Sequence, residues 1–167
     1  SKMNDLELIT FESTYIRCKI VPQAGGKIIS VYNKAMGKEF LWSNDNLTLQ
    51  LLTSGEDYDS NFWGGIDELI PNDIPETIDS ISYPDHGELW TTSLKCELFD
   101  EKVVMYGKLM LSGLYYEKTI RLDHANPIIH LHYRIINQSD LQKSFLWKLH
   151  AALTINPGDK LITDAKK

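Results

Sequence analysis

Apolar and polar residues alternate at every second position through most of this sequence, and this alternation limits the possible folds more than any other feature. Successive side chains of a strand point to opposite faces, so a half-buried strand produces this pattern. No window of about a dozen residues shows the i, i+3, i+4, i+7 apolar stripe of an amphipathic helix. The sequence therefore predicts an all-β chain.

The alternating segments are rich in β-branched residues, and short turn signals such as Gly25-Gly26 and Asp100-Glu101 join most of them. Short connections favour antiparallel neighbours, so we expect a sequential antiparallel meander. The expected strands are residues 6–11, 15–21, 27–33, 47–52, 94–99, 102–112, 114–122, 128–137 and 144–155.

Composition places the chain among globular domains and excludes some classes of partner. With 167 residues, 43% of them hydrophobic and 24% charged, the chain is long enough to bury a core as a single domain. A net charge of −6 argues against nucleic-acid binding. No apolar stretch approaches the roughly 20 residues of a membrane span, and the first residues lack the apolar region of a secretory signal. We therefore expect a cytoplasmic protein, with Cys18 and Cys96 as reduced, buried thiols.

Residues 53–91 interrupt the alternation with Gly, Pro, Asp and Asn, and such a long irregular segment is typical of functional loops. Within it, Trp63 and the neighbouring Asp67 and Glu68 combine an indole with two acids beside flexible glycines. Carboxylates bind sugar hydroxyls, and aromatic faces cover the apolar side of a sugar ring. The alternative is a solvated turn with structural glycines.

Further along, His86 lies between two carboxylates, Asp85 and Glu88, next to Gly87 and close to Trp90. Flanking carboxylates favour the imidazolium form of a histidine. The alternative is an exposed loop histidine. As a metal site the group is weak, because nothing nearby supplies a further ligand at diagnostic spacing, and we expect no metal.

A second histidine lies in the last expected strand. Alternation puts Lys148 and His150 on one face, opposite Phe145, Trp147 and Leu149. An imidazole titrates near neutral pH, so a histidine on a partly polar face is a candidate for proton transfer. The alternative is a satisfied core or surface histidine.

Residues 128–136 place His130, His132 and Arg134 together on one face of another expected strand. These imidazoles could bind a metal only with a third ligand from elsewhere. We interpret them as an outward polar face.

Five segments together resemble the aldose 1-epimerase (galactose mutarotase-like) family, in particular its aldose 1-epimerase-like branch. They occur in the family's order and are residues 21–30, 64–72, 85–90, 135–139 and 145–150. The resemblance implies an antiparallel β-sandwich of the supersandwich type, of which residues 1–167 would form one incomplete, N-terminal portion. It also implies a carbohydrate isomerase that interconverts the α and β anomers of an aldose by acid–base ring opening, without metal or organic cofactor.

The resemblance further implies residue roles. His150 matches the histidine that serves as general acid, and His86 matches the histidine that holds and polarises the sugar. Seven other residues are expected to contact the substrate: Asp67, Glu68, Asp85, Glu88 and Lys148 as polar ligands, with Trp63 and Trp90 as stacking surfaces. The expected partner is a monosaccharide or the sugar end of an oligosaccharide.

The family's general base is a glutamate well after the acid histidine, and none of the seventeen residues after His150 is a glutamate. We therefore expect a fragment of a longer fold, or a short homologue that lost or replaced its base. An incomplete sandwich exposes strand edges, which favours self-association. The alternative function is a non-catalytic carbohydrate-binding or regulatory module on the same fold.

Overall fold

The computed structural model describes residues 2–3 and 6–163, and the chain is nearly all-β, as the alternation predicts. One sheet is a four-stranded antiparallel meander in which each strand pairs with the next along the chain. Its strands are β10 (Lys95–Leu98), β11 (Lys102–Lys108), β12 (Leu114–Leu122) and β13 (Ile129–Asn137).

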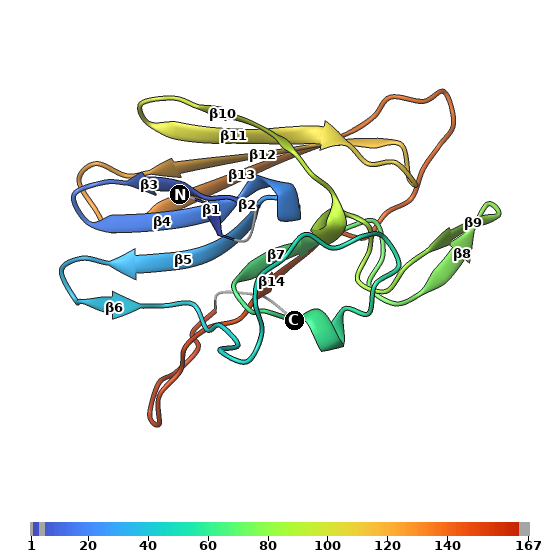
Figure 1. Cartoon of the computed structure of the whole chain (residues 1–167). Coiled ribbons are helices and arrows are strands. Elements are labelled where there is room, and N and C mark those ends of the chain that lie inside the picture. The colour runs from blue at the N-terminus through green and yellow to red at the C-terminus, as the bar shows by residue number, and fades with distance from the viewer. Residues whose placement is uncertain (1, 4–5, 164–167) are drawn as a thin grey trace.

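The second sheet has six strands and combines a local meander with one strand from far along the chain (Figure 1). Its order is β14 (Lys148–Ala151), β7 (Ile66–Leu69), β5 (Lys27–Asn33), β4 (Ile16–Val21) and β3 (Ile9–Glu12), with β6 (Lys38–Glu39) also paired to β5.

Two small hairpins and three single 3-10 turns complete the described structure. The hairpins are β1 (Lys2–Met3) with β2 (Leu6–Glu7) and β8 (Glu76–Ile78) with β9 (Ile81–Tyr83), and the turns are η1 (Pro22–Ala24), η2 (Asp59–Asn61) and η3 (Leu89–Thr91). In residues 2–3 and 6–163, no helix is long and apolar enough to cross a membrane.

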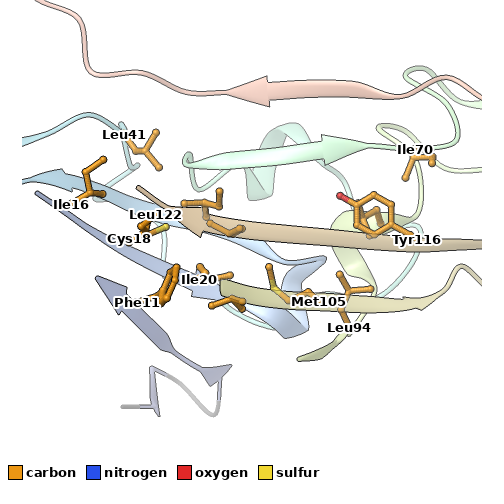
Figure 2. Close-up of a cluster of buried hydrophobic side chains, with 14 of the residues drawn as sticks. Phe11, Ile16, Cys18, Ile20, Leu41, Ile70, Leu94, Met105, Tyr116 and Leu122 are labelled. Carbon is orange, nitrogen blue, oxygen red and sulfur yellow. The ribbon is translucent and has the colours of Figure 1, made fainter. Parts of the chain in front are cut away.

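The core lies between the two sheets, so the fold is an antiparallel β-sandwich, as expected. Buried side chains of β4, such as Cys18 and Ile20, pack in one cluster with Met105 of β11 and Tyr116 of β12 (Figure 2). Every second residue of β12 is buried, because one of the two faces of this strand points at the other sheet. Burial raises the pKa of the Cys18 thiol to about 12, which makes it inert.

Several expected strands match the structure and others do not. Segments 27–33 and 114–122 coincide with β5 and β12, whereas residues 47–52 form no strand. Within the expected strand 144–155, only the four residues of β14 form a strand. The irregular segment 53–91 contains β7, which the alternation does not predict because three of its four residues are buried, two of them acidic.

The pairing of β14 with β7 is the contact that positions the candidate site. The two strands lie side by side and run antiparallel (Figure 1). In their register, His150 is directly opposite Asp67 and Leu149 is opposite Glu68. Since neighbouring residues of a strand point to opposite faces, this register puts Asp67 and Glu68 on different sides of the sheet. Asp67 therefore faces the loops, and Glu68 faces the interior of the sandwich.

Candidate functional site

His86 and His150 converge, although 64 residues separate them along the chain. Their ring centroids lie 6.3 Å apart, with the rings inclined at 59°. Within residues 2–3 and 6–163, neither Nε2 atom has a hydrogen-bond partner, so both remain available to a bound molecule. The structure thus brings together the two histidines that the sequence singles out.

A tight turn holds His86 in place. Its backbone N–H donates to the Asp73 carbonyl at 2.9 Å, and the N–H of Glu88 donates to the Ile70 carbonyl at 2.9 Å. Gly87 has a φ of +76° and passes so close to Ile70 that an added Cβ would overlap the Ile70 carbonyl oxygen. His86 itself has a φ of 60°, which is uncommon for a residue with a side chain. These contacts fix the direction of the imidazole.

Tyr58 connects the two histidines, although no pattern in the sequence predicts it as a site residue. Its ring stacks on His86 with a centroid separation of 3.7 Å and an interplanar angle of 6°. Its hydroxyl lies 3.0 Å from Nδ1 of His150 and 3.1 Å from Oδ2 of Asp67. No spacing or motif marks this tyrosine, because its role depends on a fold that brings three distant segments together.

Asp67 is buried beneath Tyr58 in an ion pair. Lys27 of β5 donates to Oδ2 of Asp67 at 2.6 Å, and both side chains are less than a tenth exposed. A buried carboxylate is tolerated when it is paired and hydrogen-bonded. Asp67 was expected to bind sugar hydroxyls, but the structure instead gives it protein partners and places it behind the tyrosine.

Burial sets the ionisation of Tyr58 and of His150, the imidazole that the Tyr58 hydroxyl contacts. Desolvation, followed by the negative charge of Asp67, raises the pKa of Tyr58, so the phenol keeps its proton at neutral pH. Desolvation lowers the pKa of His150 below its ordinary value, with Asp67 opposing the shift and the charge of His86 adding to it. At neutral pH His150 is therefore an uncharged imidazole.

Asp85 lies beside His86, with Oδ2 at 3.0 Å from the ring Nδ1. The two atoms are close enough for charge attraction but are not aligned as a hydrogen bond, and Nδ1 has no other partner in the described part of the chain. The carboxylate is about a third exposed. Of the four acids expected to bind hydroxyls, Asp85 is the one that combines an exposed carboxylate with a place beside a histidine.

Glu68 and Glu88 do not reach the site, which corrects their expected roles. Glu88 is buried and its two oxygens accept the backbone N–H groups of Leu111 at 2.6 Å and Ser112 at 2.9 Å. Glu68 points into the sandwich, where it pairs with Lys118 at 2.6 Å. Both carboxylates therefore stabilise the fold.

The two tryptophans also differ from expectation. Trp90 is buried; its indole N–H donates to the Gly87 carbonyl at 3.1 Å and its ring meets Tyr58 edge-on, so no face is free for a sugar. Trp63 is half-buried in the wall of a cavity of about 30 Å³ that Lys27 and Asp67 also line. That volume holds about one or two water molecules, so a sugar ring cannot fit in the cavity. A sugar would have to bind against the unpartnered Nε2 atoms of His86 and His150, which we call the open side of the pair.

Other side chains lie near the histidines. Phe62 packs beside His150 with ring centroids 5.2 Å apart, and the exposed Trp42 stacks on Phe62 at 6.0 Å. Lys148, expected to bind substrate, donates to both oxygens of Asp73 at 2.9 and 3.0 Å. Aromatic faces are therefore present near the histidines, although they are not those that the sequence indicated.

The structure also bears on metal and thiol chemistry. Among the described residues, no group of three or more His, Cys, Asp or Glu side chains is arranged to hold a metal ion. His130 and His132 are exposed on the outer face of β13, as predicted. Cys18 is buried, Cys96 is half-buried, and both are free thiols.

Comparisons with known proteins support the fold but assign no activity. A family described as a domain of unknown function (DUF5107) matches residues 1–76, which is less than half of the chain. A crystal structure of a TPR-domain containing protein from Parabacteroides distasonis is similar, with a TM-score of 0.58 and 19% identity. The match covers 80% of this chain and 21% of that one, so this chain spans about a fifth of the longer protein. No curated protein matches.

These findings overturn the resemblance to aldose 1-epimerases. Neither the matching family nor the similar structure points to them, and the five segments that suggested the likeness are short and individually unspecific. Three of the side chains carried over with the likeness, Glu68, Glu88 and Trp90, are used inside the fold. The roles of the remaining residues must therefore be argued from the geometry of the site.

Proposed function

We propose that the open side of the His86–His150 pair binds a sugar ring and interconverts the α and β anomers of an aldose. The observation that carries the proposal is the 6.3 Å separation of the two ring centroids, with both Nε2 atoms unpartnered within the described structure. Anomer exchange needs one group that donates a proton and one that accepts a proton at neighbouring oxygens. Two imidazoles at this separation suit that task.

The reaction would proceed by ring opening. One imidazole removes the proton of the anomeric hydroxyl while the other protonates the ring oxygen, which breaks the bond between that oxygen and the anomeric carbon. Rotation of the open aldehyde and closure on either face then give both anomers. The steps need no metal and no organic cofactor.

The surroundings favour a neutral polyol over a charged substrate. Asp85 offers a partly exposed carboxylate to hydroxyl groups, and Phe62 and Trp42 offer aromatic faces to the apolar side of a ring. The nearby ammonium of Lys148 is already paired with Asp73, so the site has little to offer a phosphate. A monosaccharide or a sugar end is therefore the substrate we propose, in a protein that we predict to be cytoplasmic.

Polarimetry on freshly dissolved α-glucose or α-galactose tests this proposal. The protein should shorten the time to anomeric equilibrium, and His150→Ala should remove most of the gain. His132→Ala is the matched control, because His132 is exposed on β13, outside the site, and its loss should leave the rate unchanged. If no sugar equilibrates faster with the protein than without it, anomer exchange is excluded.

A non-catalytic carbohydrate-binding module is the second candidate. It is favoured by the engagement of Asp67, which is bound by Lys27 and Tyr58 and so is not free to act as a base. This alternative predicts saturable binding of a sugar without acceleration of anomer exchange. It also predicts that Phe62→Ala weakens binding while His150→Ala leaves it nearly unchanged.

A further inference from the structure

The Tyr58 hydroxyl lies between a carboxylate and an imidazole, and its single proton can serve only one of them. Oδ2 of Asp67 is 3.1 Å away on one side, and Nδ1 of His150 is 3.0 Å away on the other. A protonated phenol can donate one hydrogen bond and can also accept hydrogen bonds, whereas an ionised carboxylate can only accept them. A neutral imidazole has one nitrogen that donates and one that accepts. These rules decide where each proton lies.

Asp67 must receive the phenolic proton. The carboxylate is ion-paired with Lys27 at 2.6 Å, so it has no proton to give. Without a hydrogen between them, the Tyr58 and Asp67 oxygens would repel each other at 3.1 Å. A hydrogen bond to an ionised acceptor is also about twice as strong as one between neutral groups. The Tyr58 proton therefore points to Asp67.

The remaining contact then fixes the tautomer of His150. Because the Tyr58 oxygen has given its proton to Asp67, it can only accept from Nδ1 of His150 at 3.0 Å. Nδ1 consequently carries the hydrogen, and the neutral ring has its lone pair on Nε2. Burial keeps the pKa of His150 below its ordinary value, so this neutral form is the one present at neutral pH.

We propose that Tyr58 is a positioning residue that fixes neutral His150 as the Nδ1–H tautomer, so that Nε2 acts as the general base. This inference rests on the proposed anomer exchange. His86, whose Nδ1 lies 3.0 Å from the Asp85 carboxylate, is then the general acid. The assignment reverses the acid role that the family resemblance gave to His150.

The proton transfers balance without another reactant. His150 Nε2 takes the proton of the anomeric hydroxyl as the carbonyl bond forms, and the bond from the anomeric carbon to the ring oxygen breaks. His86 Nε2 gives its proton to that oxygen. Ring closure reverses both transfers, so the two histidines return to their starting charges after each turnover.

Nitrogen-15 NMR of the imidazoles tests the tautomer without any sugar. The wild-type spectrum at neutral pH should show neutral His150 with its proton on Nδ1. Tyr58→Phe keeps the ring that stacks on His86 and removes only the hydroxyl, so it should shift His150 toward the Nε2–H form. Tyr106→Phe is the control, because Tyr106 is bound to Glu97 on the exposed part of the four-stranded sheet and should leave the ratio unchanged.

Kinetics of anomer exchange then distinguish a positioning role of Tyr58 from a purely structural one. Tyr58→Phe should lower kcat by about tenfold or more at unchanged KM, because fewer His150 rings then have the lone pair on Nε2 while the sugar contacts remain. A wild-type His150 ring protonated on Nε2 would overturn the inference, even if exchange is catalysed, and so would an unchanged tautomer ratio in Tyr58→Phe. Absence of exchange in a wild-type protein with the Nδ1–H tautomer would instead remove the proposed function and the base role with it.

Discussion

Five carboxylates lie in or near the candidate site, and their partners decide what each can do. Asp67 is held by Lys27 and Tyr58, and Asp73 is held by Lys148. Glu68 and Glu88 serve the interior of the fold, so Asp85 is left as the acid beside the histidines with an exposed oxygen. Sequence places these acids close together but cannot give their directions, because the direction of a side chain depends on partners that arrive from distant segments.

Glu88 and Asp85 should differ in their effects on stability. Glu88→Gln turns an amide NH2, a donor, toward the backbone N–H of either Leu111 or Ser112, which should lower the free energy of unfolding by about 2 kcal/mol. Asp85→Asn changes a partly exposed group and should alter it by less than about 0.5 kcal/mol. Urea unfolding measures both. Equal effects of the two substitutions would contradict the structural role of Glu88.

His150 makes stability depend on pH. Its pKa in the folded protein lies below its ordinary value of 6.5, so the unfolded chain binds this proton more tightly. Stability should therefore fall as the pH drops below about 6.5, and this contribution should stop growing below the folded-state pKa. His150→Gln removes it. Urea unfolding at pH 7.5 and pH 5 should show a smaller loss of stability in the variant, and an equal loss would count against the lowered pKa.

At the scale of elements, β7 organises both the site and the core. It lies between β14 and β5, and its two acids point to opposite faces of the sheet. The alternation in the sequence predicted β12 because every second residue of that strand is buried. It could not predict β7, since a strand with acids at two successive buried positions is possible only where lysines from other strands neutralise both.

Removing Lys118 tests whether the buried Glu68 of β7 depends on a lysine from another strand. Lys118→Met leaves the Glu68 carboxylate buried without its cation and should lower the free energy of unfolding by about 3–5 kcal/mol. Adding Glu68→Gln removes the stranded charge, so the double variant should recover much of that loss. Chemical unfolding of the two variants provides the comparison. A double variant less stable than Lys118→Met alone would show that the charge is not what destabilises the single variant.

At the scale of the whole molecule, the two sheets end at strands with exposed apolar neighbours. β13 and β14 are the last strands of their sheets in the described structure, and apolar side chains remain exposed along residues 141–162. They are Leu141, Phe145, Leu146, Trp147, Leu149, Leu153, Ile155, Leu161 and Ile162. An apolar surface of this extent beside a strand edge favours contact with another chain.

We therefore predict self-association. Size-exclusion chromatography with light scattering at low micromolar concentration should give a mass above the 19.1 kDa of one chain. The double variant Leu153→Lys, Ile155→Lys places charges on the exposed apolar surface and should shift the protein to monomer. Met36→Lys, at an exposed position of the β5–β6 turn, is the control. A wild-type protein that elutes only as monomer contradicts the prediction.

His86 and His150 must share one sugar site if they exchange anomers together. A sugar titration followed by the imidazole resonances in nitrogen-15 NMR tests whether they do. Addition of glucose or galactose should shift the signals of both rings along one saturation curve with a single Kd, while the exposed His132 signal stays in place. Signals of His86 and His150 that remain unchanged at saturating sugar, or that follow two different curves, would contradict a shared site.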